Sequence, residues 1–468
     1  MYANCDVVNP NDSSTYKVTQ ANAFHITYGD GSGADGDYFT DNFQIGNASV
    51  TNLEMGIAQS ANLTQGLLGI GYTVNEASNT DANQYSTISS PSFTYPNIID
   101  SMLSQGLIAT NAYSLYLDDL DSSTGSIIFG GLDSDKYHGD LVQMPVVPEQ
   151  LVNGSTIYAD FAVALTSFSL STTPGNSTLL TSNPYNHAVV LDSGTALTYL
   201  PTRLAQTIYQ SINAYDDSQS YAGTGLVYAN CDLLTSEPDL TFDFGFGGTS
   251  GSKNITIRVP ANELILQPSA LGLDLTGYVP TDITFQNVCI LGILSADQEP
   301  YILGDTFLRS AYVVYDLKNN VIAVAQTNFN STTSSIVEFS AGETGIPLVS
   351  GVASSAQVTE TATGKAPVGG SKTSSGAGKT TTSSSGSTTA SATGSSSGSS
   401  GSGSSSSGSG ATGSAGSIRT GSSTSAAAST ATSKAAGVRT VPAIDPSALM
   451  VLCGSAALAV LGGSVFLA

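Results

Sequence analysis

Hydrophobic and polar residues alternate along short stretches of this chain, and glycine, asparagine and aspartate separate the stretches. Between residues 24 and 43, Phe24, Ile26 and Tyr28 alternate with polar residues, and a glycine-rich turn and a second run follow. A period of two is typical of a strand with one buried face, so this stretch predicts a long β-hairpin. Residues 161–170 alternate in the same way and predict another strand.

Mainly apolar runs predict further strands, and we expect those at 66–72 and 189–191 to be buried. These runs are 66–72, 126–132, 141–147, 189–191 and 321–326. Two stretches have the period of a helix: 97–108, which follows Pro96, and 202–212, which follows Pro201. In the second, we expect Leu204, Ile208 and Ile212 to face the core. The sequence therefore predicts an all-β fold with short helices.

The composition of the chain changes after residue 340. Residues 341–440 are mostly Ser, Gly, Thr and Ala, with almost no aromatic or branched aliphatic residue after Val358. Such a segment cannot bury enough surface to fold, so we expect a disordered stalk over 341–437 and a separate tail over 438–468. The first 340 residues are long enough for a domain with a real core.

Two apolar runs end in the same dipeptide, Leu68-Gly69 and Leu303-Gly304, which suggests that the domain consists of two related lobes. A boundary near 148–155 divides it into an N-terminal lobe, 1–152, and a C-terminal lobe, 153–340.

Acidic residues dominate the charge of the chain. The chain has 36 Asp and Glu against 13 Lys and Arg, a net charge of −23, and all but three of the acids precede residue 341. This balance argues against nucleic acid as a partner and suits an acidic medium. The three histidines and four cysteines lack the spacing of a zinc site, and Asp30, Asp35 and Asp37 do not match a calcium loop. We therefore expect neither a metal nor a cofactor.

Asp192, Ser193 and Gly194 directly follow the apolar run 189–191. Glycine permits a sharp turn, which leaves the Asp192 carboxylate at the tip of a strand. The hydroxyls of Ser193 and Thr195 can donate hydrogen bonds to that carboxylate or to a facing loop. An aspartate in an ordinary turn is the alternative. A serine hydrolase built on Ser193 and His187 would need a Gly-X-Ser-X-Gly elbow, which the sequence lacks.

Five motifs in order resemble pepsin-type aspartic proteases over about residues 1–330. They are Tyr28-Gly-Asp-Gly-Ser32, Gly66-Leu-Leu-Gly-Ile-Gly71, Phe129-Gly-Gly-Leu-Asp133, Val190-Leu-Asp-Ser-Gly-Thr195 and Ile302-Leu-Gly-Asp-Thr-Phe307. The Ser/Thr-rich stalk makes the chain most similar to the fungal, yapsin-like branch that carries a glycosylphosphatidylinositol (GPI) anchor. The resemblance implies a monomeric, bilobal β fold that hydrolyses proteins or peptides, with one catalytic aspartate from each lobe.

The resemblance also assigns roles to individual residues. Asp192 corresponds to the catalytic aspartate of the C-terminal lobe, and Ser193, Gly194 and Thr195 support it. Tyr28 corresponds to the tyrosine of the flap that closes over substrate, with Gly29, Asp30 and Gly31 at the flap tip. A disulfide is expected between Cys231 and Cys289.

The chain departs from the family at its start. The first Asp-Thr-Gly should lie several tens of residues before the flap, but only 27 residues precede Tyr28, and neither Asp6 nor Asp12 belongs to such a motif. Cys5 has no evident partner. We expect an upstream segment to supply both, together with a propeptide and a signal peptide. The N-terminal lobe is then incomplete and the 468-residue chain inactive. The rival interpretation is an inactive wall glycoprotein with a protease-like fold.

Other features indicate a surface protein. Seven Asn-X-Ser/Thr sequons precede the stalk, at Asn11, Asn47, Asn62, Asn153, Asn176, Asn254 and Asn330. Residues 448–468 form an uncharged apolar tail, and Ala435-Ala436-Gly437 lies upstream across a spacer, the pattern of a GPI signal with Ala435 as one attachment site. A transmembrane helix is the alternative. We expect the chain on the outer face of the plasma membrane or in the cell wall.

Overall fold

The computed structural model describes residues 9–29, 31–63, 66–78, 93–150, 155–173, 175–182, 184–217, 224–247, 254–269, 271, 273, 275, 279–341 and 360–361. All of them belong to the first of two units, Met1–Ser371 with Ile444–Ala468; the second is Lys372–Ala443. Several predicted features lie outside the described residues: Cys5, Asp30, Asn153, Ala435, the C-terminal tail and nearly all of the stalk.

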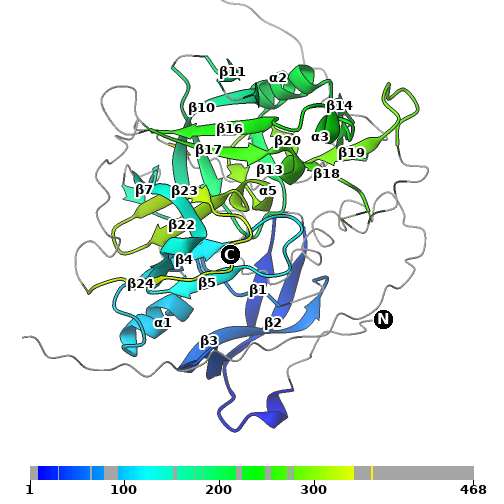
Figure 1. Ribbon diagram of the computed structural model, residues 1–468. Helices are drawn as coiled ribbons and strands as arrows, with labels where there is room; N and C mark the ends of the chain where they lie inside the picture. Colours follow the sequence, from blue (N-terminus) through cyan, green and yellow to red (C-terminus); the bar gives the residue numbers. More distant parts are fainter. Residues whose placement is uncertain are drawn as a thin grey trace, which may run out of the picture. The chain divides into compact units, whose positions relative to one another are not determined.

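The largest sheet has eight strands, in the order β17-β16-β10-β12-β21-β13-β20, with β11 beside β10 (Figure 1). The strands are β10 (Ala162–Thr173), β11 (Asn176–Leu179), β12 (His187–Leu191), β13 (Thr198–Pro201), β16 (Thr241–Phe246), β17 (Ile255–Pro260), β20 (Ile293–Ala296) and β21 (Tyr301–Leu303). Helix α2 (Thr202–Ile212) follows β13 and buries Leu204, Ile208 and Ile212, as predicted from its period.

A five-stranded sheet joins parts of the chain that are far apart in sequence. Its order is β5-β4-β22-β23-β7. The strands are β4 (Ala112–Tyr116), β5 (Ser126–Phe129), β7 (Tyr137–Pro145), β22 (Ala311–Asp316) and β23 (Val321–Thr327). The rings of Tyr113 and Tyr315 stack across β4 and β22 with centroids 4.8 Å apart, and both side chains are fully buried. This contact ties the end of the folded region to its first half.

A three-stranded antiparallel sheet contains the predicted hairpin. It consists of β1 (Lys17–Thr27), β2 (Gly33–Ile45) and β3 (Ala48–Ala61). Most residues of β1 are exposed, whereas Tyr38 on β2 is fully buried and packs edge-on against the ring of Phe24. The Gln105 side chain, just after helix α1 (Ile98–Ser104), exchanges hydrogen bonds with the Thr51 backbone on β3.

The remaining elements are short. The strands are β6 (Gly131–Asp133), β8 (Glu149–Gln150), β9 (Thr156–Ile157), β14 (Tyr215–Asp216), β15 (Val227–Asn230), β18 (Ile265–Leu266), β19 (Val288–Leu291), β24 (Ile336–Glu338) and β25 (Glu360–Thr361). The helices are α3 (Leu233–Ser236), α4 (Ala261–Leu264) and α5 (Asp305–Leu308), with 3-10 turns η1 (Pro10–Asp12), η2 (Thr73–Asn75) and η3 (Ser134–Lys136). No helix within the described ranges is long and apolar enough to cross a membrane. The all-β prediction is confirmed.

Three predicted elements differ in the structure. Residues 66–72 form no strand beyond a single bridge, because their three glycines contribute no side chains to pack against a sheet. The helix predicted over 97–108 ends at Ser104, where Gly106 takes the left-handed conformation (φ 70°). The strand predicted over 126–132 is broken at Gly130 (φ 72°) into β5 and β6.

Candidate active site

Asp192 lies where β12 ends, between two neighbouring strands. Its backbone N–H donates to the carbonyl of Leu303 at 3.2 Å, and the preceding N–H of Leu191 donates to the carbonyl of Phe161 at 3.1 Å. Val189 and Leu191 are fully buried. Asp192 thus stands at the end of a buried strand, as the sequence predicts, and hydrogen bonds to both neighbouring strands fix the backbone there.

The residues that follow Asp192 hold its carboxylate. The Gly194 N–H donates to Oδ1 at 2.8 Å, and the Thr195 hydroxyl donates to Oδ2 at 2.6 Å. Thr195 thus contacts the Asp192 carboxylate directly, which fits its predicted supporting role. Ser193 is buried (4% exposed), and the hydrogen bond predicted between its hydroxyl and a facing loop stays a prediction.

The surroundings of Asp192 favour its protonated form. The residue keeps some solvent contact, but protein atoms enclose the carboxyl group. Burial is the largest effect and raises the pKa of Asp192 above its usual value, the hydrogen bonds from Thr195 and Gly194 oppose that rise, and the charge of Asp160 adds to it. Asp192 therefore keeps its proton to a higher pH than an exposed aspartate does.

Helix α5 closes the other side of the Asp192 loop. The N–H groups of Asp305 and Thr306 donate to the carbonyls of Thr195 and Ala196 at 2.8 and 3.1 Å. A Cβ atom on Gly304 would lie 2.2 Å from the Thr195 carbonyl oxygen. Glycine is therefore required for this close approach of two backbone segments.

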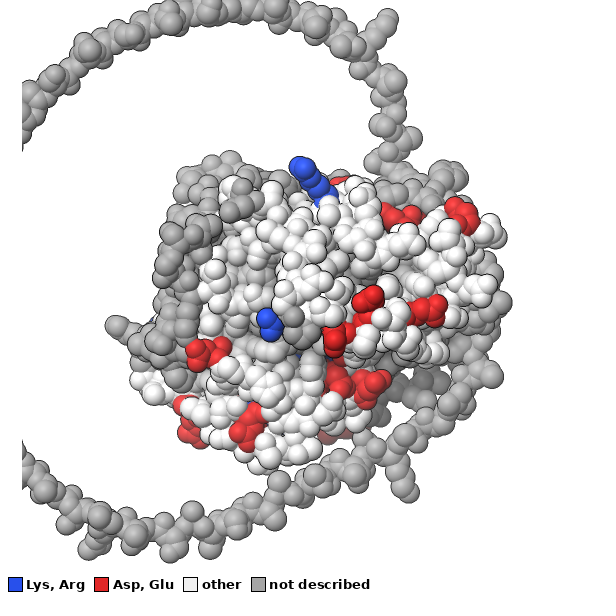
Figure 2. Space-filling model, turned by 45° about the horizontal axis from the view of Figure 1, so that its top comes forward, with Lys and Arg blue, Asp and Glu red and all other residues white. Residues whose placement is uncertain are grey.

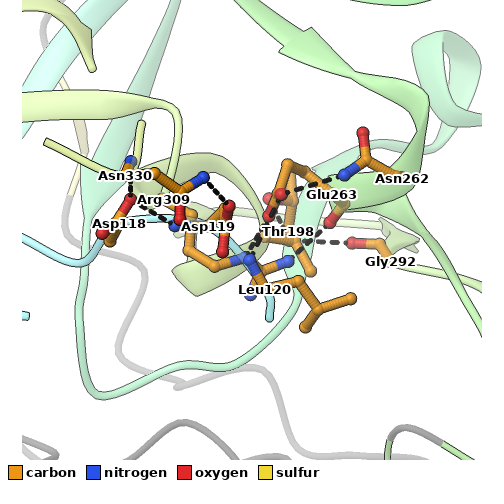
Figure 3. Close-up of polar contacts among 10 residues, drawn as sticks. Asp118, Asp119, Leu120, Thr198, Asn262, Glu263, Gly292, Arg309 and Asn330 are labelled. Atoms are coloured by element: carbon orange, nitrogen blue, oxygen red, sulfur yellow. Dashed lines mark hydrogen bonds and ion pairs between the residues drawn. The ribbon is translucent and has the colours of Figure 1, made fainter. Parts of the chain in front are cut away.

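A second buried carboxyl, Asp305, lies near Asp192. Burial raises its pKa well above the usual value; Arg309, one helical turn away, opposes the rise, and Asp192 adds to it. Arg309 donates through Nε to the Glu263 carboxylate and through Nη2 to the Glu263 carbonyl at 2.6 Å, and both side chains are almost fully buried (Figure 3). The other carboxylate oxygen of Glu263, Oε1, accepts the Leu120 N–H at 3.2 Å and the Asn262 side-chain amide at 3.3 Å. The pair thus links α4, α5 and the loop after β4.

The predicted flap tip is a tight turn between β1 and β2. The Tyr28 N–H donates to the Ser32 carbonyl at 2.8 Å, and the Gly31 N–H donates to the Tyr28 carbonyl at 3.0 Å. Gly31 has φ 82°, which explains a glycine at this position. Tyr28 lies near Tyr95 and adds to the raised pKa of that phenol, of which burial is the main cause. Closure of Tyr28 over Asp192 stays a prediction.

Other predicted residues are placed outside this centre. Cys231, just after β15, and Cys289 on β19 form the expected disulfide, with Cα atoms 5.1 Å apart. All the sequon asparagines that the structure describes are exposed: Asn11, Asn47, Asn62, Asn176, Asn254 and Asn330. Among the described residues, no group of His, Cys, Asp and Glu could hold a metal ion.

Sequence reasoning assigned no role to Asp160, Asp305 or Glu263. Asp305 belongs to a motif that carried the resemblance, so its position was visible but its burial was not. Asp160 directly precedes the strand predicted over 161–170, and the pairing of that strand with 189–191 would have placed it near Asp192. Glu263 had no sequence signal, because its partner Arg309 lies 46 residues away.

This fold is that of a known class. The Eukaryotic aspartyl protease family matches residues 3–327, and the chain belongs to this family. A solved structure, the aspartic proteinase from Irpex lacteus, shares the fold with a TM-score of 0.50 and 22% identity, over 69% of this chain and 86% of that one. The predicted pepsin-like fold is confirmed.

Named relatives are fungal. The probable aspartic-type endopeptidase opsB of Aspergillus oryzae is 40% identical over 341 residues, which are 72% of this chain and 62% of that protein. The acid protease of Saccharomycopsis fibuligera is 39% identical over 68% of this chain and 70% of its own length. The yapsin-3 aspartic proteinase of Saccharomyces cerevisiae is 32% identical over 70% of this chain and 59% of its own length. The chain spans less than two thirds of the opsB and yapsin-3 proteins.

Proposed function

We propose that this protein is an acid endopeptidase in which Asp192 is one of two catalytic aspartates. The observation that carries the proposal is the Asp192 carboxylate, fixed by Gly194 and Thr195 at the end of a buried strand in an aspartyl protease fold. The names of the relatives as endopeptidases and acid proteases support it. The acidic side chains that prevail among the charged groups in Figure 2 suit work at low pH.

The chemistry follows from two carboxyl groups that share one proton. The ionised member takes a proton from a bound water, which attacks the peptide carbonyl, while the protonated member polarises that carbonyl and then protonates the leaving nitrogen. Thr195 and Gly194 stabilise the ionised form of Asp192, and burial stabilises the neutral form. Asp192 is therefore suited to exchange a proton during the reaction.

The sequence holds a single Asp-Ser-Gly and no Asp-Thr-Gly. We expect the 468 residues by themselves not to hydrolyse peptides, and activity to require a segment that carries the second motif. The test compares this chain with one extended at its N-terminus by the corresponding segment of a fungal relative, assayed on a peptide library between pH 3 and 7 with and without pepstatin.

The extended chain should be active in acid and inhibited by pepstatin, and Asp192→Asn should lower its activity by about 10³-fold or more. Full activity after Asp192→Ala, or pepstatin-resistant hydrolysis at neutral pH, contradicts the proposal. An extended chain that folds and binds pepstatin but hydrolyses nothing favours the alternative function, an inactive wall glycoprotein with this fold.

We further propose that the protein acts on extracellular or cell-wall proteins from a GPI anchor. The support is the apolar tail 448–468, the small residues near Ala435 and the Ser/Thr-rich stalk 341–437, which suits O-glycosylation and an extended conformation. Phosphatidylinositol-specific phospholipase C or wall digestion should release the protein from intact cells. Retention after both treatments supports a spanning helix instead.

The exposed sequon asparagines are proposed carriers of N-linked glycans. Endoglycosidase treatment of the protein secreted from a fungal host should lower its apparent mass, and site mapping should find glycans at several of them. An unchanged mass contradicts this proposal but leaves the proposed activity intact.

A further inference from the structure

Strand register places a further aspartate directly opposite Asp192. Antiparallel β10 and β12 pair Val163 with Val189 and Ala162 with Val190, and the Leu191 N–H donates to the Phe161 carbonyl. Continued one residue beyond Phe161 and Leu191, this register brings Asp160 opposite Asp192. Side chains at such cross-strand positions start about 5 Å apart, so the two carboxyl groups are neighbours.

A third carboxyl, Glu149, lies on the far side of Asp160. The Val147 N–H donates to the Ala162 carbonyl at 2.8 Å, so the segment that leads to β8 runs along the start of β10. Glu149 is 6% exposed, and its side chain hydrogen-bonds that of Asp160. Asn75 on η2 donates through Nδ2 to Asp160 Oδ1 at 3.1 Å. Glu149, Asp160 and Asp192 thus form a row, which we call the carboxyl row.

Two effects act on the charge of Asp160 in opposite directions. Burial is the larger and raises the pKa of Asp160 above its usual value, while the hydrogen bond with Glu149 opposes that rise. The Asn75 amide donates to the Asp160 carboxyl group and also favours its ionised form. An ionised Asp160 opposes ionisation of its neighbour Asp192, because like charges at this distance repel in a partly buried site.

We propose that Asp160 is a positioning residue of the active site, whose carboxylate, held by Asn75 and Glu149, sets the protonation of Asp192 across the β10–β12 pair. The inference rests on the proposed function only for the role of Asp192. Asp160 stands just before β10, whose first residues pair with β12.

Other titratable groups face Asp192 from the elements packed against it. Asp305 on α5 lies near it, as do Tyr113 on β4 and Tyr315 on β22. Burial raises the pKa of both tyrosines far above its usual value, so they stay neutral in acid. The charge of Asp192 adds to the raised pKa of Asp305, which Arg309 opposes, and none of these groups is changed by substitution of Asp160.

The experiment is a pH titration of the full 468-residue chain labelled with ¹³Cγ-aspartate, in which the Asp192 signal is identified by its loss in Asp192→Asn. Asp160→Asn should lower the titration midpoint of Asp192 by about one pH unit, and Asp160→Glu should largely restore it. Glu149→Gln should leave it in place, because the amide also donates to Asp160. Asp100→Asn is the matched control, since burial also raises the pKa of Asp100 but it lies on α1 outside the row.

An Asp192 midpoint that stays within about 0.2 pH units after Asp160→Asn overturns the proposal. If that variant does not fold, Asn75→Ala serves instead, because it removes one hydrogen-bond donor from Asp160. The titration midpoint of Asp160 should then rise, and that of Asp192 should fall. An unmoved Asp192 midpoint in Asn75→Ala likewise overturns it. Because the titration needs no turnover, it can fail while the protease activity stands, and it can succeed in a chain without activity.

Discussion

The Asp192 loop and the hairpin that bears Tyr28 are held in opposite ways. The strands on either side of Asp192 are buried. The loop that contains Asp192 forms hydrogen bonds with β21, with α5 and with the Asp192 carboxylate. The strand β1 before Tyr28 is mostly exposed, and the turn is held by bonds between β1 and β2. A catalytic carboxyl needs a fixed place and little water, whereas a segment that admits substrate must open at low cost.

The largest effect is expected where the Asp192 loop meets α5. Gly304→Ala should lower the free energy of unfolding by about 4 kcal/mol or more, because the new methyl group meets backbone oxygens of Thr195 and Leu197 that cannot move aside. Urea unfolding measures it. Gly66→Ala, where a Cβ has open space, is the control and should change stability little. An equal loss of stability in the two variants would show that close packing at Gly304 is not what makes its substitution costly.

The hairpin sheet has its own buried anchor in Tyr38. Tyr38→Ala should cost about 3–4 kcal/mol, since the fully buried ring packs on Phe24 and Phe93. Tyr38→Phe should cost nothing, because none of the described residues forms a hydrogen bond with the buried hydroxyl. Thermal unfolding of both variants checks this. A costly Tyr38→Phe would show that the hydroxyl, and not the ring, holds the sheet.

Glu76 should make the free energy of unfolding depend on pH. Burial raises its pKa to about 8 from a usual 4.5, so between these values the folded chain holds a proton that the unfolded chain has lost. Its contribution is complete below pH 4.5 and is lost as the pH rises through 8. From pH 5 to 8 this group should cost on the order of 1–3 kcal/mol, after allowance for solvent screening.

Urea unfolding at both pH values should show that Glu76→Gln removes this loss, whereas Glu338→Gln, on the exposed strand β24, does not. An unchanged pH dependence in Glu76→Gln would contradict the assignment of the proton to this carboxyl group.

Removal of one hydroxyl tests how the Asp192 loop stabilises charge. Thr195→Val should raise the pKa of Asp192 by about one unit, because the hydroxyl donates to the ionised carboxylate, and should cost about 1 kcal/mol at neutral pH. Thr195→Ser keeps the donor and should keep the pKa. A titration of Asp192 in both variants measures the difference; equal midpoints would mean that the hydroxyl does not act on the charge.

The smallest effect is expected on the hairpin surface. His25 and Asp35 face each other across β1 and β2 as an ion pair, with side chains 60% and 64% exposed. His25→Gln should change the free energy of unfolding by less than about 0.5 kcal/mol at pH 5, because exposed pairs are screened by water and salt. A loss above about 1 kcal/mol would show that the hairpin is held more tightly than its exposure indicates.

Local pattern was sufficient wherever one short segment decides its own conformation. The period of 202–212 predicted α2 to the residue, and the alternation around 24–43 predicted the β1–β2 hairpin, because buried faces impose those periods on the sequence. The sharp turn after Val189–Leu191 predicted that Asp192 stands at a strand tip, and the hydroxyl of Thr195 was predicted as its donor. The glycine-rich run 66–72 was predicted wrongly, since its apolar residues pack without a partner strand along their length.

Tertiary structure alone decided which residues surround Asp192. Arg309 meets Glu263 across 46 residues, Asp305 comes to Asp192 from more than a hundred residues away, and the pairing of β10 with β12 brings Asp160 near Asp192. None of these contacts has a local period, and the motif that contains Asp305 does not show what Asp305 lies against, because each contact depends on which strands pair and on what they bury. The sequence by itself determined where a carboxylate could be presented; the folded chain decided which charges surround it, and thereby the pH at which it holds its proton.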